Sequence, residues 1–580
     1  MELHFTKNSR AKLLAMGMVV LMAIFVLRLF YIQIIQHDLY RTLADSEQMK
    51  QYVLHAKRGE IYTMDGKTPQ KLVMNETVYT VWADPSVVTE KSALVDAIQQ
   101  IAGGNTRKDF AKYLDRTDTR YQVLATKVTR KQAEMLKSKK LAGLGFDAVS
   151  QRVYPEGQLA SQVLGFVDAE GDGKYGFEQA NDADLKGKNG VLKTVTDVRD
   201  VPLTVGDKNV KIPAKNGKNM VLTIDRNVQN QAEKALMDGL ERTGATKASA
   251  IVMDPTNGHV LAMANVPTYN PGNLSTLEDV SLLNNSVISY PYEPASVIKT
   301  VIMSAGLDKG VMTPQSTYNN TDYITIEDHT VQNATKGQIG TTSMQKALSW
   351  SLNSGTVTVA KWLGGGSINR TARDTMYEYY HDRFRLGQKT GIELANEQAG
   401  TIIAPSDPEG NAVRYADMTY GQGLDITTLQ VATAFCAIVN GGQYIQPTVI
   451  AGTMSDEGTY MPAVQKPSTQ ILKASTSETM RQMTYNARNE FKLSHPDTPG
   501  YSVGGKTGTA QTIENGKYVF DQTVGTYVGY GAEKNGMPAY VVMVQLEAPQ
   551  KALSGTKDVS PVFTDISNWM LSYLRLTPQE

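Results

Sequence analysis

The chain has 580 residues, equal numbers of acidic and basic side chains, and apolar residues at 41% of its positions. This length exceeds what one hydrophobic core supports, so two or more domains are expected, and a net charge of zero argues against an electrostatic footprint for nucleic acid. Cys436 is the only cysteine and the seven histidines are scattered. We therefore expect no internal disulfide, no metal site and no cofactor.

An apolar stretch near the N-terminus covers residues 13–35 and is interrupted only by Arg28 and Gln33. It is long enough to cross a bilayer as a helix. Basic residues precede the stretch and acidic residues dominate after it, namely Lys7, Arg10 and Lys12, then Asp38, Asp45 and Glu47. The positive-inside rule then places residues 1–12 in the cytoplasm and the bulk of the chain outside it. We expect a single-pass anchor in the cytoplasmic membrane, because the stretch is too long for a cleaved signal peptide.

Residues 36–215 are expected to form a mixed, non-catalytic domain. His37–Tyr52 is predicted to continue the membrane helix, Asp65-Gly66 predicts a turn between strands, and residues 90–137 predict a helical pair. Paired buried charges more often hold loops in register than catalyse. We therefore interpret three separated side chains as one structural network: Arg58, Arg152 and Glu178.

A second domain is expected over residues 216–580. Met220–Asp225 is predicted to be a strand that ends at a helix cap. Asn257-Gly258 and Asn535-Gly536 each lie between two apolar runs, a strong signal for a β-hairpin, and residues 566–574 are expected to close the chain as a helix. Strands at both ends with helices between them predict an α+β domain, in which an antiparallel sheet carries a helical cluster.

Ser296 and Lys299 lie between these hairpins, at the start of an apolar run that ends at Gly310. In a helix, a spacing of three places both side chains on one face. A hydroxyl needs a base to become a nucleophile, and a desolvated lysine amine is a suitable one. The same spacing recurs elsewhere in the chain, so it does not identify a site alone; the other pairs are Ser9/Lys12, Ser343/Lys346 and Ser554/Lys557.

Two more short motifs lie further along. Ser351-Leu352-Asn353 stands between two helical runs, and Lys506-Thr507-Gly508-Thr509 precedes the second hairpin, which predicts an edge strand. Ser367-Ile368-Asn369 and Lys389-Thr390-Gly391 repeat these patterns. Lys389 lacks the strand-plus-hairpin context, so we choose Lys506.

The ordered set Ser-x-x-Lys, Ser-x-Asn and Lys-Thr-Gly resembles the signature of penicillin-binding proteins and serine β-lactamases. Further segments resemble the class B penicillin-binding proteins, so that the likeness covers nearly the whole chain: Tyr292–Ser296, Tyr420–Gly423 with Thr427 and Gln430, Lys506–Ala510, the anchor, Arg58-Gly59, Arg152–Pro155, Gly176–Glu178 and Leu222–Asp225. The chain departs from the family at residues 62–72 and at Val297-Ile298. The resemblance implies a transpeptidase domain on an elongated pedestal that serves dimerisation or partner binding, behind one transmembrane helix.

The resemblance also implies a D,D-transpeptidase that cross-links peptidoglycan stem peptides. Ser296 would attack the D-Ala-D-Ala carbonyl, with Lys299 as general base. Ser351 would relay a proton, and Asn353 would bind a substrate amide.

The remaining implied residues bind the substrate. Lys506, Thr507 and Thr509 would hold the terminal carboxylate, with Gly508 in the same strand, and the N–H groups of Ser296 and Thr509 would form the oxyanion hole. Gln422 is interpreted either as a residue that lines the pocket or as a satisfied loop amide.

The resemblance implies β-lactams as covalent inhibitors, a membrane-embedded glycosyltransferase as partner, and division or elongation proteins as further partners. Asn353, where elongation types in some bacteria carry aspartate, favours the division septum. Four alternatives stay open: an elongation-type enzyme, a β-lactam-hydrolysing relative, a β-lactam sensor and a non-catalytic scaffold of the division machinery. A β-lactam-hydrolysing enzyme would need a Glu-x-x-Leu-Asn segment to activate water, and we find no convincing one between Ser351 and Lys506. A β-lactam sensor would need a longer cytoplasmic arm.

Overall fold

The computed structural model describes residues 9–40, 49–195, 210–514, 517–549 and 551–579. Most of the expected cytoplasmic tail, residues 1–8, lies outside them. The chain forms two compact units that interleave along the sequence. Met1–Lys57 and Gly187–Gly217 make up the first, and Arg58–Lys186 and Lys218–Glu580 make up the second.

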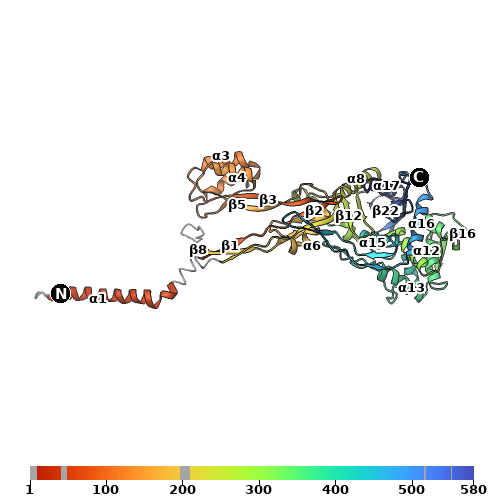
Figure 1. Cartoon of the computed structure of the whole chain (residues 1–580), viewed down its shortest axis with the longest axis horizontal. Helices are drawn as coiled ribbons and strands as arrows, with labels where there is room; N and C mark the ends of the chain where they lie inside the picture. The colour runs from red at the N-terminus through yellow and green to blue at the C-terminus, as the bar shows by residue number, and fades with distance from the viewer. Residues whose placement is uncertain (1–8, 41–48, 196–209, 515–516, 550, 580) are drawn as a thin grey trace. The chain divides into compact units, whose positions relative to one another are not determined.

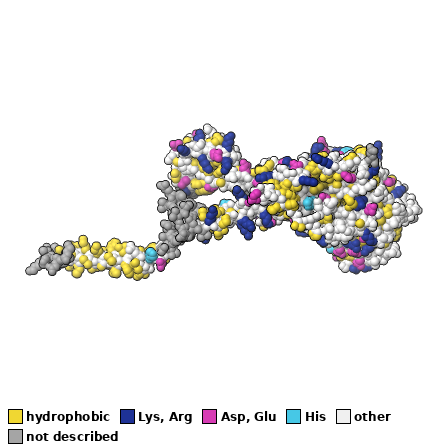
Figure 2. Space-filling view, viewed as in Figure 1, with side chains coloured by type: hydrophobic (Ala, Val, Ile, Leu, Met, Phe, Trp, Pro, Cys, Tyr) yellow, Lys and Arg dark blue, Asp and Glu magenta, His cyan; other side chains and the backbone are white. Residues whose placement is uncertain are grey.

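The first unit contains the apolar helix and a small sheet. Helix α1 (Ser9–Phe30) continues into a π-helical turn (Tyr31–Ile35), and residues 11–35 have a mean hydropathy of 2.6, enough in length and composition to cross a membrane. Figure 2 shows apolar side chains over the visible face of this helix.

The expected helix over His37–Tyr52 is wrong at its end. Residues 41–48 lie outside the described part of the chain, and β1 (Met49–Leu54) pairs antiparallel with β8 (Gly190–Val195), which also pairs with β9 (Val210–Ile212). The partner strand lies far away in the sequence, so local periodicity does not reveal this pairing.

The second unit contains a seven-stranded sheet in the order β19-β18-β10-β2-β3-β4, with β5 paired to β3. Its strands are β2 (Ile61–Asp65), β3 (Thr68–Ala83), β4 (Gln122–Thr129), β5 (Leu144–Val153), β10 (Asn219–Asp225), β18 (Ile450–Met454) and β19 (Tyr460–Pro462). The turn at Asp65-Gly66 is confirmed. The predicted helical pair is present as α3 (Lys91–Ala102) and α4 (Arg130–Ser138), but β4 lies between them and was not predicted.

Met220–Asp225 forms the predicted strand, and Asp225 caps helix α8 (Arg226–Thr243) by accepting from the N–H groups of Asn227 and Val228. However, this strand pairs in parallel with β2 and therefore belongs to the seven-stranded sheet. It does not contribute to the antiparallel sheet that holds the candidate site.

That second sheet has the order β12-β11-β23-β22-β21 and is antiparallel throughout. Its strands are β11 (Lys247–Met253), β12 (Val260–Val266), β21 (Tyr501–Glu514), β22 (Lys517–Glu533) and β23 (Tyr540–Ala548). Both predicted hairpins are confirmed, and the Lys-Thr-Gly motif lies on the edge strand β21, as expected. Helices α8 and α17 (Ser560–Tyr573) pack on one face and α15 (Thr428–Val439) on the other (Figure 1).

A helical cluster follows the first hairpin, and two of its helices pack against α15. Its longer helices are α10 (Lys299–Asp308), α11 (Met344–Ser349), α12 (Asn353–Leu363), α13 (Arg370–Tyr377), α14 (Ala412–Met418) and α16 (Ala474–Asn489). Short elements complete the unit: α5 (Ser161–Leu164), β6 (Phe166–Val167), β7 (Gly173–Lys174), α6 (Gly176–Ala180), α7 (Asp182–Lys186), α9 (Ser286–Ser289), β13 (Thr317–Asn320), β14 (Tyr323–Ile326), β15 (His329–Gln332), β16 (Gly340–Ser343), β17 (Gln443–Ile445) and β20 (Ser468–Gln470).

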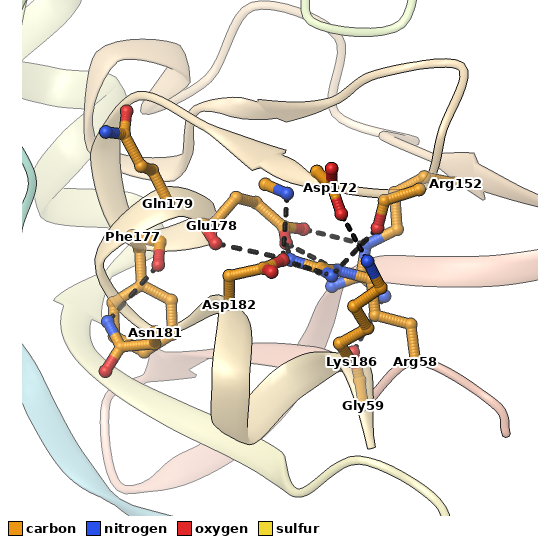
Figure 3. A network of polar contacts seen from close by, with 12 residues as sticks. Arg58, Gly59, Arg152, Asp172, Phe177, Glu178, Gln179, Asn181, Asp182 and Lys186 are labelled. Carbon is orange, nitrogen blue, oxygen red and sulfur yellow. Dashed lines mark hydrogen bonds and ion pairs between the residues drawn. The ribbon is translucent and has the colours of Figure 1, made fainter. Parts of the chain in front are cut away.

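The structure brings Arg58, Arg152 and Glu178 together in one network (Figure 3). The Glu178 carboxylate is fully buried and accepts from Arg58 at 2.5 and 2.8 Å and from Arg152 Nε at 2.8 Å. Arg58 also pairs with Asp182 at 2.7 Å, and Arg152 donates to the carbonyl of Gly59 at 2.7 Å. The network thereby ties β5 and the residues just before β2 to the α6–α7 segment.

Replacing Glu178 by glutamine should destabilise this region strongly. Two buried guanidinium groups would lose their common counter-charge, and breaking a buried pair costs about 3–5 kcal/mol. Urea unfolding of the full chain in detergent measures the loss. Glu156→Gln is the matched control, because the Glu156–Arg226 pair is more than a third exposed and such pairs contribute about 0–1 kcal/mol. Equal losses in both variants would contradict this interpretation of the network.

Candidate active site

Ser296 lies in a 3₁₀ turn (Ala295–Ile298) that runs directly into α10. The predicted helix is therefore present, but its first turn is tighter than an α-helix, and the preceding Ala295 has φ +57°. A non-glycine residue in this left-handed region is strained, a feature that clusters at functional sites. Ser296 is half-buried, whereas the side chain of Lys299 has no exposed surface.

The side-chain amine of Lys299 connects α10 to the Ser-x-Asn motif. Its Nζ donates to the carbonyl of Ser351 at 2.6 Å, to Asn353 Oδ1 at 2.6 Å and to Ser351 Oγ at 3.2 Å. Burial and, secondarily, the charge of Lys506 hold the pKa of Lys299 well below its usual value. A lowered pKa favours the neutral form of this side chain, which is the form that can accept a proton.

Lys506 reaches the same hydroxyl from the edge strand. Its Nζ lies 3.0 Å from Ser351 Oγ, 3.0 Å from the carbonyl of Thr507 and 3.3 Å from Thr507 Oγ1. Burial lowers the pKa of Lys506 to about 7. Ser351 Oγ is thus contacted by two lysine amines that arrive from different elements.

The Ser-x-Asn motif is held in a special backbone conformation. Ser351 links α11 to α12 and has φ +56°, which turns its hydroxyl and its carbonyl toward Lys299. Asn353 begins α12, accepts from Lys299 and donates from Nδ2 to the carbonyl of Gln332 at 2.8 Å. One of its two amide hydrogens therefore already has a partner.

A cleft of about 1180 Å³ opens over these groups. The predicted residues that line it are Ser296, Ser351, Asn353, Gln422, Lys506, Thr507, Gly508 and Thr509. Lys299 lies beneath the cleft floor and is not among the residues that line it. Within the described part of the chain the Ser296 hydroxyl makes no hydrogen bond. The structure therefore places Ser296 in the same cleft as Ser351 but shows no hydrogen bond from Ser296 to Lys299.

Thr509 is anchored in a way that the sequence did not indicate. Its Oγ1 accepts from the N–H of Gly555 at 3.2 Å, in a π-helical turn (Gly555–Val559) that precedes α17. A Cβ at Gly508 would lie 2.2 Å from Thr526 Oγ1. The Lys-Thr-Gly segment of β21 is therefore closely packed against the Gly555–Val559 turn and against Thr526 of the neighbouring strand β22.

The Tyr420–Gly423 segment packs against the backbone that precedes Ser296. Gly421 has φ +90°, its carbonyl accepts from the N–H of Ala295 at 3.2 Å, and the N–H of Gly423 donates to Glu293 Oε1 at 2.7 Å. A Cβ at Gly421 would lie 2.1 Å from the carbonyl oxygen of Ala295. This glycine allows the loop to fix the strained turn beside Ser296.

The resemblance stated above implies that penicillins acylate Ser296. On that expectation, Gly421→Ala should reduce the rate of acylation by at least about tenfold, since moving the Ala295 backbone misplaces Ser296. Stopped-flow labelling with a fluorescent penicillin measures the rate. Gly458→Ala is the control: Gly458 has a similar φ of +85°, but no atom lies within 4 Å of its added Cβ. Equal rates in the two variants would contradict the proposed effect of the collision at Ala295 on Ser296.

Other parts of the cleft were not predicted. The loop and hairpin residues His329–Thr335 form part of the wall, and Trp350 packs edge-on against Phe491 with ring centroids 5.1 Å apart. Buried Arg488 pairs with Asp497 at 2.6 Å and donates to the Tyr527 hydroxyl at 2.6 Å. These residues come from segments without motifs, and only the tertiary fold brings them to the cleft.

A serine in a cleft, two buried lysines of lowered pKa and a second serine between them define the class of active-site serine acyl-transferring enzymes. Family comparison gives the particular group. The model described as "Penicillin binding protein transpeptidase domain" matches residues 248–568. The model described as "Penicillin-binding Protein dimerisation domain" matches residues 53–222. The chain belongs to the class B penicillin-binding proteins and carries their transpeptidase domain.

Individual relatives agree with this assignment. The chain is 30% identical over 495 residues to the penicillin-binding protein PbpB of Mycobacterium tuberculosis, covering 82% of this chain and 70% of the relative. It is 25% identical over 581 residues to the probable peptidoglycan D,D-transpeptidase PenA of Neisseria gonorrhoeae, covering 99% and 94%. The fold is shared with the crystal structure of penicillin-binding protein 3 from Mycobacterium tuberculosis in complex with aztreonam, with a TM-score of 0.67, 24% identity and coverage of 91% and 98%.

Proposed function

We propose that this chain is a membrane-anchored peptidoglycan D,D-transpeptidase that cross-links stem peptides through an acyl-enzyme on Ser296. One observation supports this most directly: the two amines of Lys299 and Lys506 contact Ser351 Oγ at 3.2 and 3.0 Å, and Ser351 lines the same cleft as Ser296. The name of the Neisseria relative, a probable peptidoglycan D,D-transpeptidase, supports the substrate class.

In the proposed first step, neutral Lys299 accepts the proton of Ser296 as Ser296 Oγ attacks the carbonyl of the penultimate D-alanine. The catalytic contact tightens in the substrate complex, as such contacts often do. The peptide C–N bond then breaks, and the proton reaches the leaving D-alanine amine through Ser351. An amine of a second stem afterwards attacks the ester, forms the cross-link and frees Ser296.

The substrate contacts follow from the cleft lining. Lys506, Thr507 and Thr509 hold the terminal carboxylate by charge-assisted hydrogen bonds, beside the close-packed Gly508. Asn353 uses its second amide hydrogen for the substrate amide, and Gln422 lines the pocket. The N–H groups of Ser296 and Thr509 form the oxyanion hole, each contributing on the order of 3 kcal/mol.

A β-lactam is expected to acylate Ser296 by the same steps. Its ring amide takes the place of the scissile peptide bond, Ser296 opens the ring, and the tethered leaving group stays in the cleft. The mycobacterial neighbour was solved in complex with aztreonam, which supports binding of such inhibitors in this fold.

The membrane and cellular roles form the second part of the proposal. Residues 13–35 would anchor the chain with residues 1–12 in the cytoplasm, residues 36–215 would form a pedestal for dimerisation or partners, and residues 216–580 would hold the transpeptidase. A membrane-embedded glycosyltransferase would supply the glycan strands. Asn353 favours action at the division septum. A fluorescent fusion along the side wall instead of at the septum would reverse that last choice.

The pH profile of acylation by a carboxylate-bearing donor should be bell-shaped. Below the lowered pKa of Lys299 the base is protonated and the rate falls. Above the Lys506 pKa of about 7 the cation that binds the carboxylate is lost, so kcat/KM falls again. Lys506→Arg keeps its charge and should remove the alkaline limb. A wild-type profile that rises steadily to pH 10 would contradict these roles.

The function itself is tested with the full chain in detergent and an N-acylated peptide ending in D-Ala-D-Ala. The proposal predicts release of D-alanine, transfer of the acyl group to an added D-amino acid, and loss of both reactions after exposure to penicillin. Rapid transfer to water alone, with turnover of penicillin, would indicate a hydrolase and overturn the proposal.

A further inference from the structure

The candidate cleft has an unbalanced charge. The described residues that line it include no aspartate or glutamate, but they include Arg488, Lys492, Lys506 and Lys557. Arg488 is neutralised by Asp497, and Lys506 has hydrogen-bond partners around Ser351. By contrast, across the described parts of the chain the ammonium groups of Lys492 and Lys557 have no hydrogen bond or ion pair.

Lys557 lies beside the motif strand. It belongs to the π-helical turn Gly555–Val559, whose Gly555 donates to Thr509 Oγ1 at 3.2 Å. The approach is close, because a Cβ on Gly555 would be 2.5 Å from the carbonyl oxygen of Gly508. The turn therefore holds Lys557 at the cleft, next to the Thr509 end of the motif.

The direction in which the acyl donor binds follows from its pairing with β21. This step rests on the proposed function. β21 is an edge strand, and an extended peptide can pair with such an edge. With its terminal carboxylate at Lys506 and Thr507 and its scissile carbonyl at the Thr509 N–H, the donor runs antiparallel to β21. The residue before D-Ala-D-Ala then passes Thr509 on the side where the Gly555–Val559 turn lies.

We propose that Lys557 forms a second carboxylate subsite, which binds an acidic side chain on the donor residue that precedes D-Ala-D-Ala. The subsite selects stem peptides with a free carboxylate at this residue over those with a carboxamide, and it disfavours those with a free amine. Lys506 binds the terminal carboxylate, and Lys557 binds the side-chain carboxylate of the residue before D-Ala-D-Ala.

Three synthetic donors of the form acyl-X-D-Ala-D-lactate test this selection, with X carrying a carboxylate, a carboxamide or an amine of similar length. The full-length protein in detergent is assayed for D-lactate release at low salt. Exposed ion pairs are typically worth up to about fivefold in binding, so we expect a two- to fivefold preference for carboxylate over carboxamide that declines in high salt. Lys557→Gln should bring this ratio to about one, and Lys557→Glu should reverse the order of the carboxylate and amine donors.

Lys492→Gln is the matched control, because it removes one positive charge from the same cleft. Lys492 follows α16, whose Tyr485 backbone packs near Gly504, at the start of β21. Its variant should keep the carboxylate preference. Equal loss of preference in both variants would indicate general attraction by the cleft and overturn the assignment, as would an unchanged ratio in Lys557→Gln.

The wild-type protein separates failure of this inference from failure of the proposed function. Labelling by penicillin and turnover of all three donors at equal rates would leave the transpeptidase standing and reject the subsite. No labelling and no turnover of any donor would reject the proposed function itself.

Discussion

Replacing Ser296 by alanine is expected to abolish covalent labelling by a fluorescent penicillin while leaving the protein folded. The hydroxyl is the proposed acyl acceptor, so alanine removes the oxygen that would form the ester. Because this hydroxyl makes no hydrogen bond to the described residues and the side chain is half-buried, its loss should cost little stability. Gel fluorescence after saturating penicillin, together with the thermal unfolding midpoint, measures both properties.

The chain offers a matched control in Ser343, which shares the Ser-x-x-Lys spacing with Lys346. Ser343 Oγ instead accepts from the N–H of Lys346 at 3.2 Å and caps α11. Ser343→Ala should lose about 1 kcal/mol of helix capping and keep full labelling. Undiminished labelling of a folded Ser296→Ala protein would disprove the assignment of the nucleophile.

The second large effect is expected at Lys299. Methionine retains the length and apolar character of the side chain but has no basic nitrogen, so Lys299→Met should slow acylation by about 10²- to 10⁴-fold, the usual contribution of a general base. Lys299→Arg should slow acylation as well, since a guanidinium group stays protonated and cannot act as a base. Pre-steady-state labelling with penicillin measures the acylation rate constant.

Lys309→Met controls for the loss of a lysine from the same helix region. Lys309 follows the other end of α10 and forms an exposed pair with Glu378 at 3.2 Å, so the variant should acylate at nearly the wild-type rate. If Lys299→Met retained more than about a tenth of the wild-type rate, Ser296 would have to be activated by another base.

The sequence predicted those features that depend on local chemistry. The apolar stretch at 13–35 suffices for a long helix, and Asn257-Gly258 and Asn535-Gly536 mark hairpins because these residues tolerate the backbone of tight turns. The second hairpin also places Lys506 on an edge strand. The order of the three motifs along the chain then indicated one shared cleft.

Other features depend on contacts between distant segments. The assignment of Met220–Asp225 to the seven-stranded sheet requires its parallel partner β2, and β1 requires β8. In the site, the Ser-x-x-Lys spacing predicted that Lys299 acts on Ser296. In the structure, however, the Lys299 amine donates its hydrogen bonds to Ser351 and Asn353. Left-handed backbone at Ser351 makes those bonds accessible, and no sequence pattern indicates such a conformation at a serine.

The most direct test of the central claim is peptide mapping of the trapped adduct. The full-length protein is incubated with benzylpenicillin, digested with protease and analysed by tandem mass spectrometry. We predict one penicilloyl group per chain, attached to the peptide that contains Ser296 and localised to that serine. An adduct on a different side chain, or an unmodified Ser296 peptide at saturating penicillin, would contradict the account.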